Sequence, residues 1–359
     1  MKKTEILFGL VFGAVIMVEP GLMASHAGAV AQEAGHRTIP LRELEKPRQI
    51  RAENQQVYFV DDRDILVYSL AEGRLLRRVG KPGQGPGEFV MGPLRLTIFP
   101  DRLVVGDFRK IQFFSHEGNY LGQVREPGMI QRLPFLPVGK NFVGFPMEIR
   151  EDGSLAPPVG YIYDQEGKVL RKFYGEIPAG PPPPPPPGGA APARKEDVSL
   201  IEDYADYAIH EDKIFVADSR KGLYIAVFNE NGDPLYEIRQ ELKRIKVPKD
   251  FKESALDKDK GSKYWEAYNP VAPEFFPAFF GFKIDGGRIY AITPDQKNGQ
   301  YEVIVMDLKG KILDRSHRFL LEPNYFAPEA FSLDYDVEEN QFVWFAYNEA
   351  KEYYELHIR

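Results

Sequence analysis

Three short motifs place an aspartate two residues before an arginine, and they are the first candidates for ligand chemistry. The motifs are Asp61-Asp62-Arg63, Asp107-Phe108-Arg109 and Asp218-Ser219-Arg220. A guanidinium fork binds a carboxylate or sulfate through two parallel hydrogen bonds. Arg63, Arg109 and Arg220 are therefore candidates for binding an acidic ligand. Carboxylate oxygens suit Ca²⁺, which makes Asp61, Asp107 and Asp218 candidates for a calcium site.

A structural role is the competing interpretation of these motifs, and we favour it. Each aspartate closes a run of β-forming residues, a position where Asp side chains commonly accept backbone N–H groups of the following turn. The arginine of the motif then pairs with a neighbouring part of the fold. The arginine site and the calcium site remain hypotheses beside this interpretation.

A second candidate is a segment rich in aromatic residues that includes Tyr264, Trp265 and Tyr268. Aromatic rings of this kind stack on a sugar or a peptide. The alternative, which we favour, is that the segment packs onto the fold as a lid. No other proline lies between Pro248 and Pro270, so the sequence predicts one or two helices between them.

Signatures of catalysis are missing from the sequence. The chain contains no cysteine, which excludes a thiolate nucleophile, a thiolate metal site and disulfides. The histidines show no His-x-x-x-His spacing, and no serine lies in a nucleophile elbow. The 46 Lys and Arg against 53 Asp and Glu give a net charge of −7, so the basic footprint that nucleic-acid binding needs is also missing.

The N-terminus has the pattern of a secretory signal peptide. Lys2 and Lys3 precede an uncharged apolar run, Ile6–Val18, and small residues follow it. That run is shorter than the roughly 20 residues a membrane span needs. We predict a signal peptide over residues 1–31 with cleavage after Ala31, or alternatively after Ala24, and no membrane span in the mature chain. The pattern looks bacterial, so we expect a periplasmic or extracellular protein.

An internal repeat supplies the elements that position these candidates. In its clearest copy, Ile214–Asp218 and Tyr224–Phe228 are β-rich runs, Asn231-Gly232 is a hairpin turn and Leu235–Ile238 closes the unit. One further run precedes each copy. The same order recurs from the runs Val57–Asp61, Leu103–Asp107, Phe142–Phe145 and Ile289–Ile292.

A sixth unit is incomplete, and its shape predicts how the fold closes. It contains the runs Phe331–Tyr335, Phe342–Ala346 and Tyr353–Ile358 but no closing strand. Setting aside the insertions 176–203 and 241–278 leaves about 44 residues per unit, within the roughly 40–45 of a four-stranded blade. The sequence therefore predicts an all-β fold over 32–359, a six-bladed β-propeller with four antiparallel strands per blade. Thr38–Leu44 should supply the missing outer strand and close the ring.

Two segments carry a resemblance to a known family. Asp218-Ser219-Arg220 with Ile225–Phe228 and Asn231-Gly232 resembles the NHL repeat, and Gly80–Phe89 resembles the glycine-proline connector of NHL-repeat-like six-bladed β-propellers exported by bacteria. The resemblance spans roughly residues 37–359. Units 3, 5 and 6 depart from it because no Asp ends their second strand. Members of this group mostly lack an assigned function, so the resemblance implies a fold rather than an activity.

The expected loop positions give the functional hypothesis. Strand alternation should place both insertions, including the polyproline stretch 181–187, on one face of the ring, and insertions in repeat folds collect on the binding face. We therefore expect a monomeric, non-enzymatic binding or scaffold propeller that recognises a peptide, glycan or protein partner there. The alternative is a metal-dependent propeller enzyme of the lactonase or lyase type.

Overall fold

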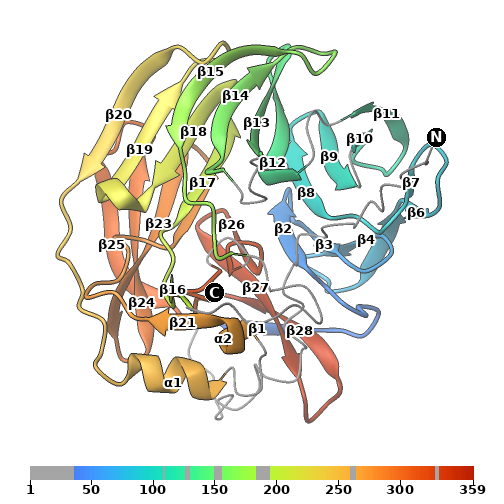
Figure 1. Cartoon of the computed structure of the whole chain (residues 1–359). Helices are drawn as coiled ribbons and strands as arrows, with labels where there is room; N and C mark the ends of the chain where they lie inside the picture. Colours follow the sequence, from blue (N-terminus) through green and yellow to red (C-terminus); the bar gives the residue numbers. More distant parts are fainter. Residues whose placement is uncertain are drawn as a thin grey trace, which may run out of the picture.

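The computed structural model describes residues 36–107, 110–125, 130–148, 156–182, 195–258, 264–327 and 331–359. Over these residues the chain forms six four-stranded antiparallel sheets around a central axis (Figure 1), which confirms the predicted six-bladed β-propeller. From the innermost strand outward, the blades are β2 (Gln49–Glu53), β3 (Gln56–Val60), β4 (Ile65–Ser69) and β5 (Leu75–Val79); β8 (Arg95–Phe99), β9 (Arg102–Asp107), β10 (Lys110–Phe114) and β11 (Tyr120–Arg125); β12 (Ile130–Val138), β13 (Asn141–Met147), β14 (Val159–Tyr163) and β15 (Val169–Glu176); β17 (Ala205–His210), β18 (Lys213–Asp218), β19 (Leu223–Phe228) and β20 (Pro234–Gln240); β22 (Gly281–Asp285), β23 (Arg288–Lys297), β24 (Gln300–Asp307) and β25 (Ile312–Phe319); and β26 (Tyr335–Glu338), β27 (Gln341–Asn348), β28 (Tyr353–Ile358) and β1 (Arg37–Leu41).

Tight turns between the third and fourth strands fix the register of the blades. In blade 4, Asn229 Oδ1 accepts the backbone N–H groups of Asn231 and Asp233 at 3.0 and 2.9 Å. Gly232 completes this turn with φ +77°, a left-handed conformation that glycine adopts without strain. Asp307 caps the corresponding turn of blade 5 in the same way. The hairpin signals in the sequence therefore mark real turns.

The N-terminus completes blade 6, as predicted. β1 pairs antiparallel with β28, from Arg37 opposite Ile358 to Leu41 opposite Tyr354. The strand stops at Leu41 rather than continuing over the whole predicted run Thr38–Leu44. Pairing covers the free edge of β28, which would otherwise be open to association with another chain.

The innermost strand of blade 6 is shifted from its prediction. The run Phe331–Tyr335 was expected to be a strand, but Phe331 lies in a turn and the strand covers Tyr335–Glu338. Phe331 is buried against Phe280 and Phe319, with ring centroids 5.6 and 5.9 Å apart. An apolar residue can thus be buried from a turn, and this makes the turn resemble a strand in the sequence.

Hydrophobic packing between neighbouring blades holds the ring together. Each core cluster of the described residues combines side chains from adjacent blades; for example, Ile39 of blade 6 packs with Phe59 of blade 1. The turn glycine Gly73 has φ +71°, and a Cβ there would lie 2.6 Å from Ile39 Cγ2. Glycine at this turn therefore permits both the left-handed backbone and the close approach of blade 1 to blade 6.

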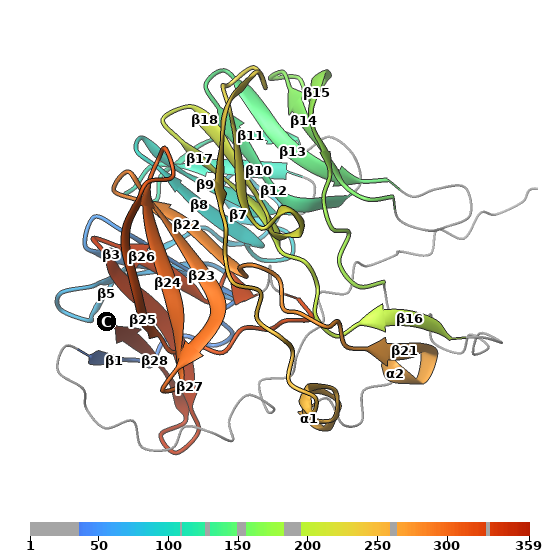
Figure 2. The same cartoon turned by 90° about the vertical axis from the view of Figure 1, so that its left-hand side faces the viewer.

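The insertions form a layer outside the ring. β16 (Glu196–Ser199) pairs in parallel with β21 (Tyr268–Val271), so the two predicted insertions join each other. α1 (Phe251–Lys258) and α2 (Tyr264–Ala267) confirm the helices expected between Pro248 and Pro270. Figure 2 shows these four elements together on one side of the blades. Smaller elements are η2 (Ser219–Lys221) and the parallel pair β6 (Lys81–Pro82) and β7 (Glu88–Phe89). None of the helices in the described ranges is long and apolar enough to cross a membrane.

Candidate functional site

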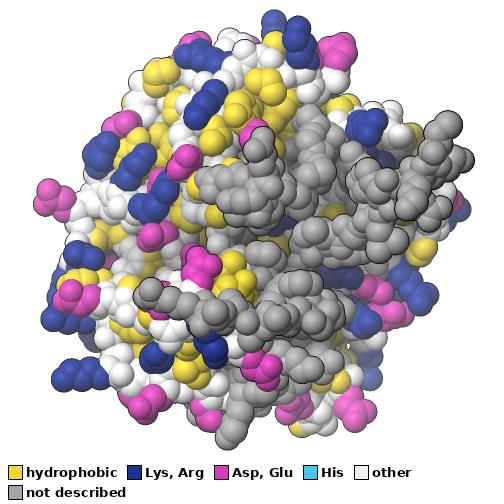
Figure 3. Space-filling model, viewed as in Figure 1, with side chains coloured by type: hydrophobic (Ala, Val, Ile, Leu, Met, Phe, Trp, Pro, Cys, Tyr) yellow, Lys and Arg dark blue, Asp and Glu magenta, His cyan; other side chains and the backbone are white. Residues whose placement is uncertain are grey.

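One face of the propeller carries the long loops. Because adjacent strands in a blade are antiparallel, the connectors between blades lie on the same face as the loops between second and third strands. We call this the long-loop face, and the opposite side, with the tight hairpin turns, the short-turn face. Figure 3 views the long-loop face and shows Lys and Arg interspersed with Asp and Glu around its described rim. No uniformly basic surface is visible on that part.

The three motif aspartates bind the connectors that enter their blades. Asp61 accepts the backbone N–H groups of Glu45 and Lys46 at 3.0 and 2.5 Å, and Asp107 accepts that of Val90 at 3.2 Å. In blade 4 the neighbouring Ser219 binds the connector, accepting the Tyr204 N–H at 2.9 Å. These bonds are the ones that the structural interpretation of the motifs expects.

The calcium hypothesis needs these carboxylates to converge. Among the described residues, one group of three ligating side chains has its ligand atoms within 4.8 Å of one another, and it contains Asp295, Glu302 and His317. Asp61, Asp107 and Asp218 are not part of it. A calcium site formed by those three aspartates stays an untested prediction, and the structure does not bring them together.

The motif arginines differ from one another. Arg220 donates from Nε and Nη2 to Asp218 at 2.9 and 2.8 Å, and also donates to the carbonyl of Glu176 in the neighbouring blade 3. These bonds raise the pKa of Arg220. Arg63 is exposed and makes no hydrogen bond or ion pair with another described residue. Arg109 lies outside the described residues. Arg63 is thus the described motif arginine that is available to a ligand.

Replacing Arg220 should therefore reduce stability, whereas replacing Arg63 should not. Arg220→Gln removes the charged partner of Asp218, which is fully buried, and we expect a loss of about 2–3 kcal/mol of unfolding free energy. Arg63→Gln serves as the matched control and should change it by less than about 0.5 kcal/mol. Urea unfolding of both variants measures the difference. Equal stabilities would mean that Arg220 does not brace blades 3 and 4.

The structure brings the aromatic candidates together in the insertion layer. Tyr264 contacts Trp265 and Tyr268, with ring centroids 4.9 and 4.7 Å apart, and Phe326 packs on the first two. The Tyr264 hydroxyl donates to the Pro182 carbonyl at 3.1 Å. Burial raises the pKa of Tyr264 well above its usual value. These rings pack largely on each other, as expected of a lid, so a flat stacking platform for sugars is poorly supported.

A cluster of charged side chains lies at the axis, where the innermost strands meet. Lys283 of β22 donates to the Ser332 carbonyl at 2.6 Å, and its Nζ lies 3.9 Å from Asp336 Oδ1 of β26. Asp336 also accepts the Ala52 N–H of blade 1 at 2.9 Å. On β17, Asp206 accepts the Tyr204 hydroxyl at 3.1 Å. We call Arg51, Arg95, Asp206, Lys283, Asp334 and Asp336 the axial cluster.

Burial shifts the protonation equilibria of the axial cluster toward neutral pH. Desolvation, with the nearby Arg51 charge, lowers the pKa of Lys283 to about 8. Desolvation raises the pKa of Asp334 to about 7, against the opposing effect of Lys283. It also raises the pKa of Asp206. Clefts that carry such shifted groups are frequent functional sites. The axial cluster therefore joins the long-loop face as the candidate site.

Sequence reasoning missed the axial cluster, although a signal for it was present. The innermost strands carry charges at alternate positions, as in Arg51 and Glu53, or Lys283 and Asp285. Alternation of period two marks one face of a strand. In a central strand of a propeller blade, that face points to the axis or the next blade, not to bulk solvent. The pattern is informative once the strand order is known.

The opposite end of the axis is acidic. Burial and neighbouring carboxylates raise the pKa values of Glu53, Asp285 and Glu338, the last to about 6. Glu338 also accepts the Gln55 N–H at 2.7 Å across the junction of blades 6 and 1. This end carries no insertion from the described chain.

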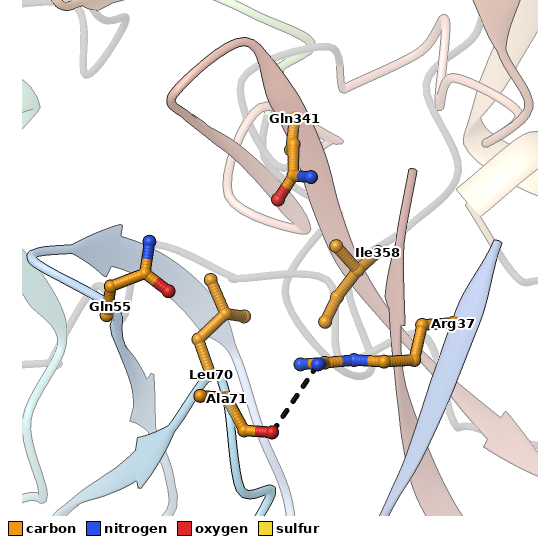
Figure 4. Close-up of a pocket in the computed structure, with 6 residues that line it drawn as sticks. All are labelled: Arg37, Gln55, Leu70, Ala71, Gln341 and Ile358. Atoms are coloured by element: carbon orange, nitrogen blue, oxygen red, sulfur yellow. Dashed lines mark hydrogen bonds between the residues drawn. The ribbon is translucent and has the colours of Figure 1, made fainter. Parts of the chain in front are cut away.

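A small hollow of about 280 Å³ lies near this junction (Figure 4). Its lining residues are Arg37, Gln55, Leu70, Ala71, Gln341 and Ile358. Arg37 reaches across it to the Ala71 carbonyl at 3.4 Å. The volume is at the lower limit for ligand pockets, and Arg37 already joins its two sides. We therefore interpret the hollow as part of the ring closure.

Comparisons with known proteins support the fold and leave the family open. No protein-family model and no curated protein matches the chain. A crystal structure from Bacteroides fragilis named "Putative exported protein" is similar with a TM-score of 0.50 and 11% identity, covering 92% of this chain and 97% of that one. The structure of U3-55K aligns with a TM-score of 0.40 and 12% identity over 79% of this chain and 68% of that one. At these identities the likeness to solved structures extends to the fold alone.

Proposed function

We propose that this protein is an exported, non-enzymatic binding propeller that receives a polypeptide, either a peptide or a segment of a protein partner, on its long-loop face. The observation that carries the proposal is the position of the insertions: β16, β21, α1 and α2 all lie on that side of the ring. Loops held by a rigid scaffold are where binding usually develops. The export, the periplasmic or extracellular location and the monomeric state belong to the same proposal.

The axial cluster favours a polypeptide over a glycan. It contains cations such as Lys283 and carboxylates such as Asp334 within one partly buried site. Peptides carry amide donors and acceptors and charges of both signs, which complement such a lining. Sugars bind through open aromatic faces, and the rings of Tyr264 and Trp265 are packed against Phe326 instead. The metal-dependent lactonase or lyase remains the alternative, and elemental analysis of the mature protein discriminates between the two.

Peptide-library selection on the mature chain tests the proposal. We expect enriched peptides whose affinity falls at least tenfold in Lys283→Met, which removes the axial cation. Their affinity should also fall as the pH rises through about 8, because Lys283 is charged below its lowered pKa and neutral above it. Lys309→Met on the short-turn face is the control and should change neither quantity. Failure to enrich any peptide, or equal affinity for both variants, would contradict the proposal.

A further inference from the structure

A histidine and two carboxylates converge on the outer part of blade 5, away from the axial cluster. His317 Nε2 lies 3.2 Å from Asp295 Oδ2, and one ligating atom from each of Asp295, Glu302 and His317 lies within 4.8 Å of the others. Glu302 is 4% exposed. The three residues come from three neighbouring strands, β23, β24 and β25.

The local fold explains why these three side chains meet. Glu302 and His317 are direct partners across β24 and β25, so their side chains lie on the same face of the sheet. On β23 the pairing register shifts between Ile292 and Gln296. Pro294 lies inside this irregular stretch, and proline cannot donate to a strand ladder. The resulting bulge turns Asp295 toward the other two ligands.

The geometry suits a small transition-metal cation. Bonds of about 2.0–2.1 Å in a tetrahedral zinc site separate neighbouring ligand atoms by roughly 3.3–3.4 Å. The observed 3.2 Å between His317 Nε2 and Asp295 Oδ2 is close to that separation. Imidazole and carboxylate ligands together suit Zn²⁺ and its neighbours in the first transition row.

Glu302 keeps a free acceptor position while its orientation is fixed. It accepts hydrogen bonds from Arg315 Nε and Nη2 at 2.5 and 3.2 Å and from the Thr293 hydroxyl at 2.8 Å. A carboxylate has about four lone-pair positions, so one remains for a metal. Hydrogen bonds of this kind orient ligating carboxylates in metal sites. Arg315 neutralises Glu302, which leaves the Asp295 charge to favour a dication.

We infer that Asp295, Glu302 and His317 form a binding site for a divalent transition metal of the Zn²⁺ class. The side chains of Asp295 and His317 are 44% and 26% exposed, so an ion can enter from solvent. Three protein ligands leave at least one coordination position open to water or to an oxygen of a bound molecule. The site is independent of the axial cluster, and each proposal can fail without the other.

Zinc titration of the intact mature protein tests the site. By isothermal calorimetry with ZnCl₂ in a non-chelating buffer, we expect one ion per chain with a micromolar or tighter Kd. Asp295→Asn and His317→Gln should each weaken binding at least tenfold. Both side chains are partly exposed, so these variants should fold, and circular dichroism verifies this. Glu302→Gln is avoided because it would leave Arg315 without its charged partner.

Two histidine variants serve as controls. His116→Gln removes an exposed histidine of blade 2. His357→Gln removes one member of the contacting pair His36 and His357, whose Nε2 and Nδ1 atoms lie 3.1 Å apart and which is the other place where histidine nitrogens meet in the described chain. Both controls should bind zinc as the wild type does. Absence of stoichiometric binding, wild-type affinity in His317→Gln, or loss of binding in His357→Gln would overturn the inference.

Discussion

Deleting residues 32–45 is expected to abolish the stable monomeric ring. The deletion removes β1 and with it Ile39, Leu41 and Leu44, which are 8%, 0% and 7% exposed. Burial of each such side chain is worth about 1.5–3 kcal/mol. Their combined contribution is comparable with the roughly 5–15 kcal/mol by which a whole domain is stable. The deletion also exposes the edge of β28 to pairing with other chains.

Thermal unfolding together with light scattering measures this effect. The truncated chain should lose its cooperative transition or associate. Two point variants in the same strand separate packing from chain length: Leu41→Ala should cost about 2–5 kcal/mol, whereas Thr38→Ala, at an exposed position, should cost less than about 0.5 kcal/mol. An unchanged melting temperature in a truncated monomer would show that β1 does not close the ring.

Acid is expected to weaken the same closure through a histidine pair. His36 and His357 stack with ring centroids 5.2 Å apart, and Trp344 stacks on both. Burial and the nearby His36 lower the pKa of His357 to about 4, and Glu355 only partly opposes this shift. Thr38 Oγ1 is the other polar atom close to the ring, at 3.5 Å from Nδ1.

The sign of the pH effect follows from these values. The unfolded chain binds a proton at this histidine below about pH 6.5, whereas the folded chain resists protonation down to about pH 4. Stability that is present above pH 6.5 is therefore lost as the pH falls toward 4. A shift of this size corresponds to at most about 3 kcal/mol.

Other groups act in the opposite direction, so a variant is needed to isolate the histidine. Burial raises the pKa of Asp334 to about 7 and that of Glu338 to about 6, which stabilises the folded state as the pH falls through these values. The measurement is therefore the difference in unfolding free energy between wild type and His357→Gln, from pH 7.5 to 4.5. We expect the wild type to lose about 2–3 kcal/mol more than the variant, and His116→Gln to follow the wild type. Parallel curves for wild type and His357→Gln would refute the effect.

The fold could be predicted because its signals are local. Turns such as Asn229–Asp233 carry their own hydrogen-bond acceptor and glycine, so a few residues define them. Counting complete units then showed that one strand was missing, and the N-terminal run was the available β-forming segment. Phe331 misled because burial and strand formation are different properties, and its sequence shows only the first.

The candidate sites depended on contacts between distant segments, which a single sequence does not display. β16 and β21 are far apart in the chain and pair in parallel, so no hairpin turn announces them. Lys283 and Asp336 meet because two blades converge on the axis. The group around His317 arises from a bulge at Pro294 and from cross-strand register, and no fixed spacing such as His-x-x-x-His describes it.

Pairing of β1 with β28 also imposes an order on folding. Arg37 and Ile358 are opposite each other although 320 residues separate them in the chain, so closure is the contact with the longest sequence separation in its blade and should form late. The first strand to be synthesised then stays without its partner until the last strand is available. Blades 1–5 are built from consecutive hairpins and can form beforehand. A nascent or C-terminally truncated chain should therefore resemble an open arc with one unpaired blade edge, the state in which this protein is most exposed to aggregation and proteolysis.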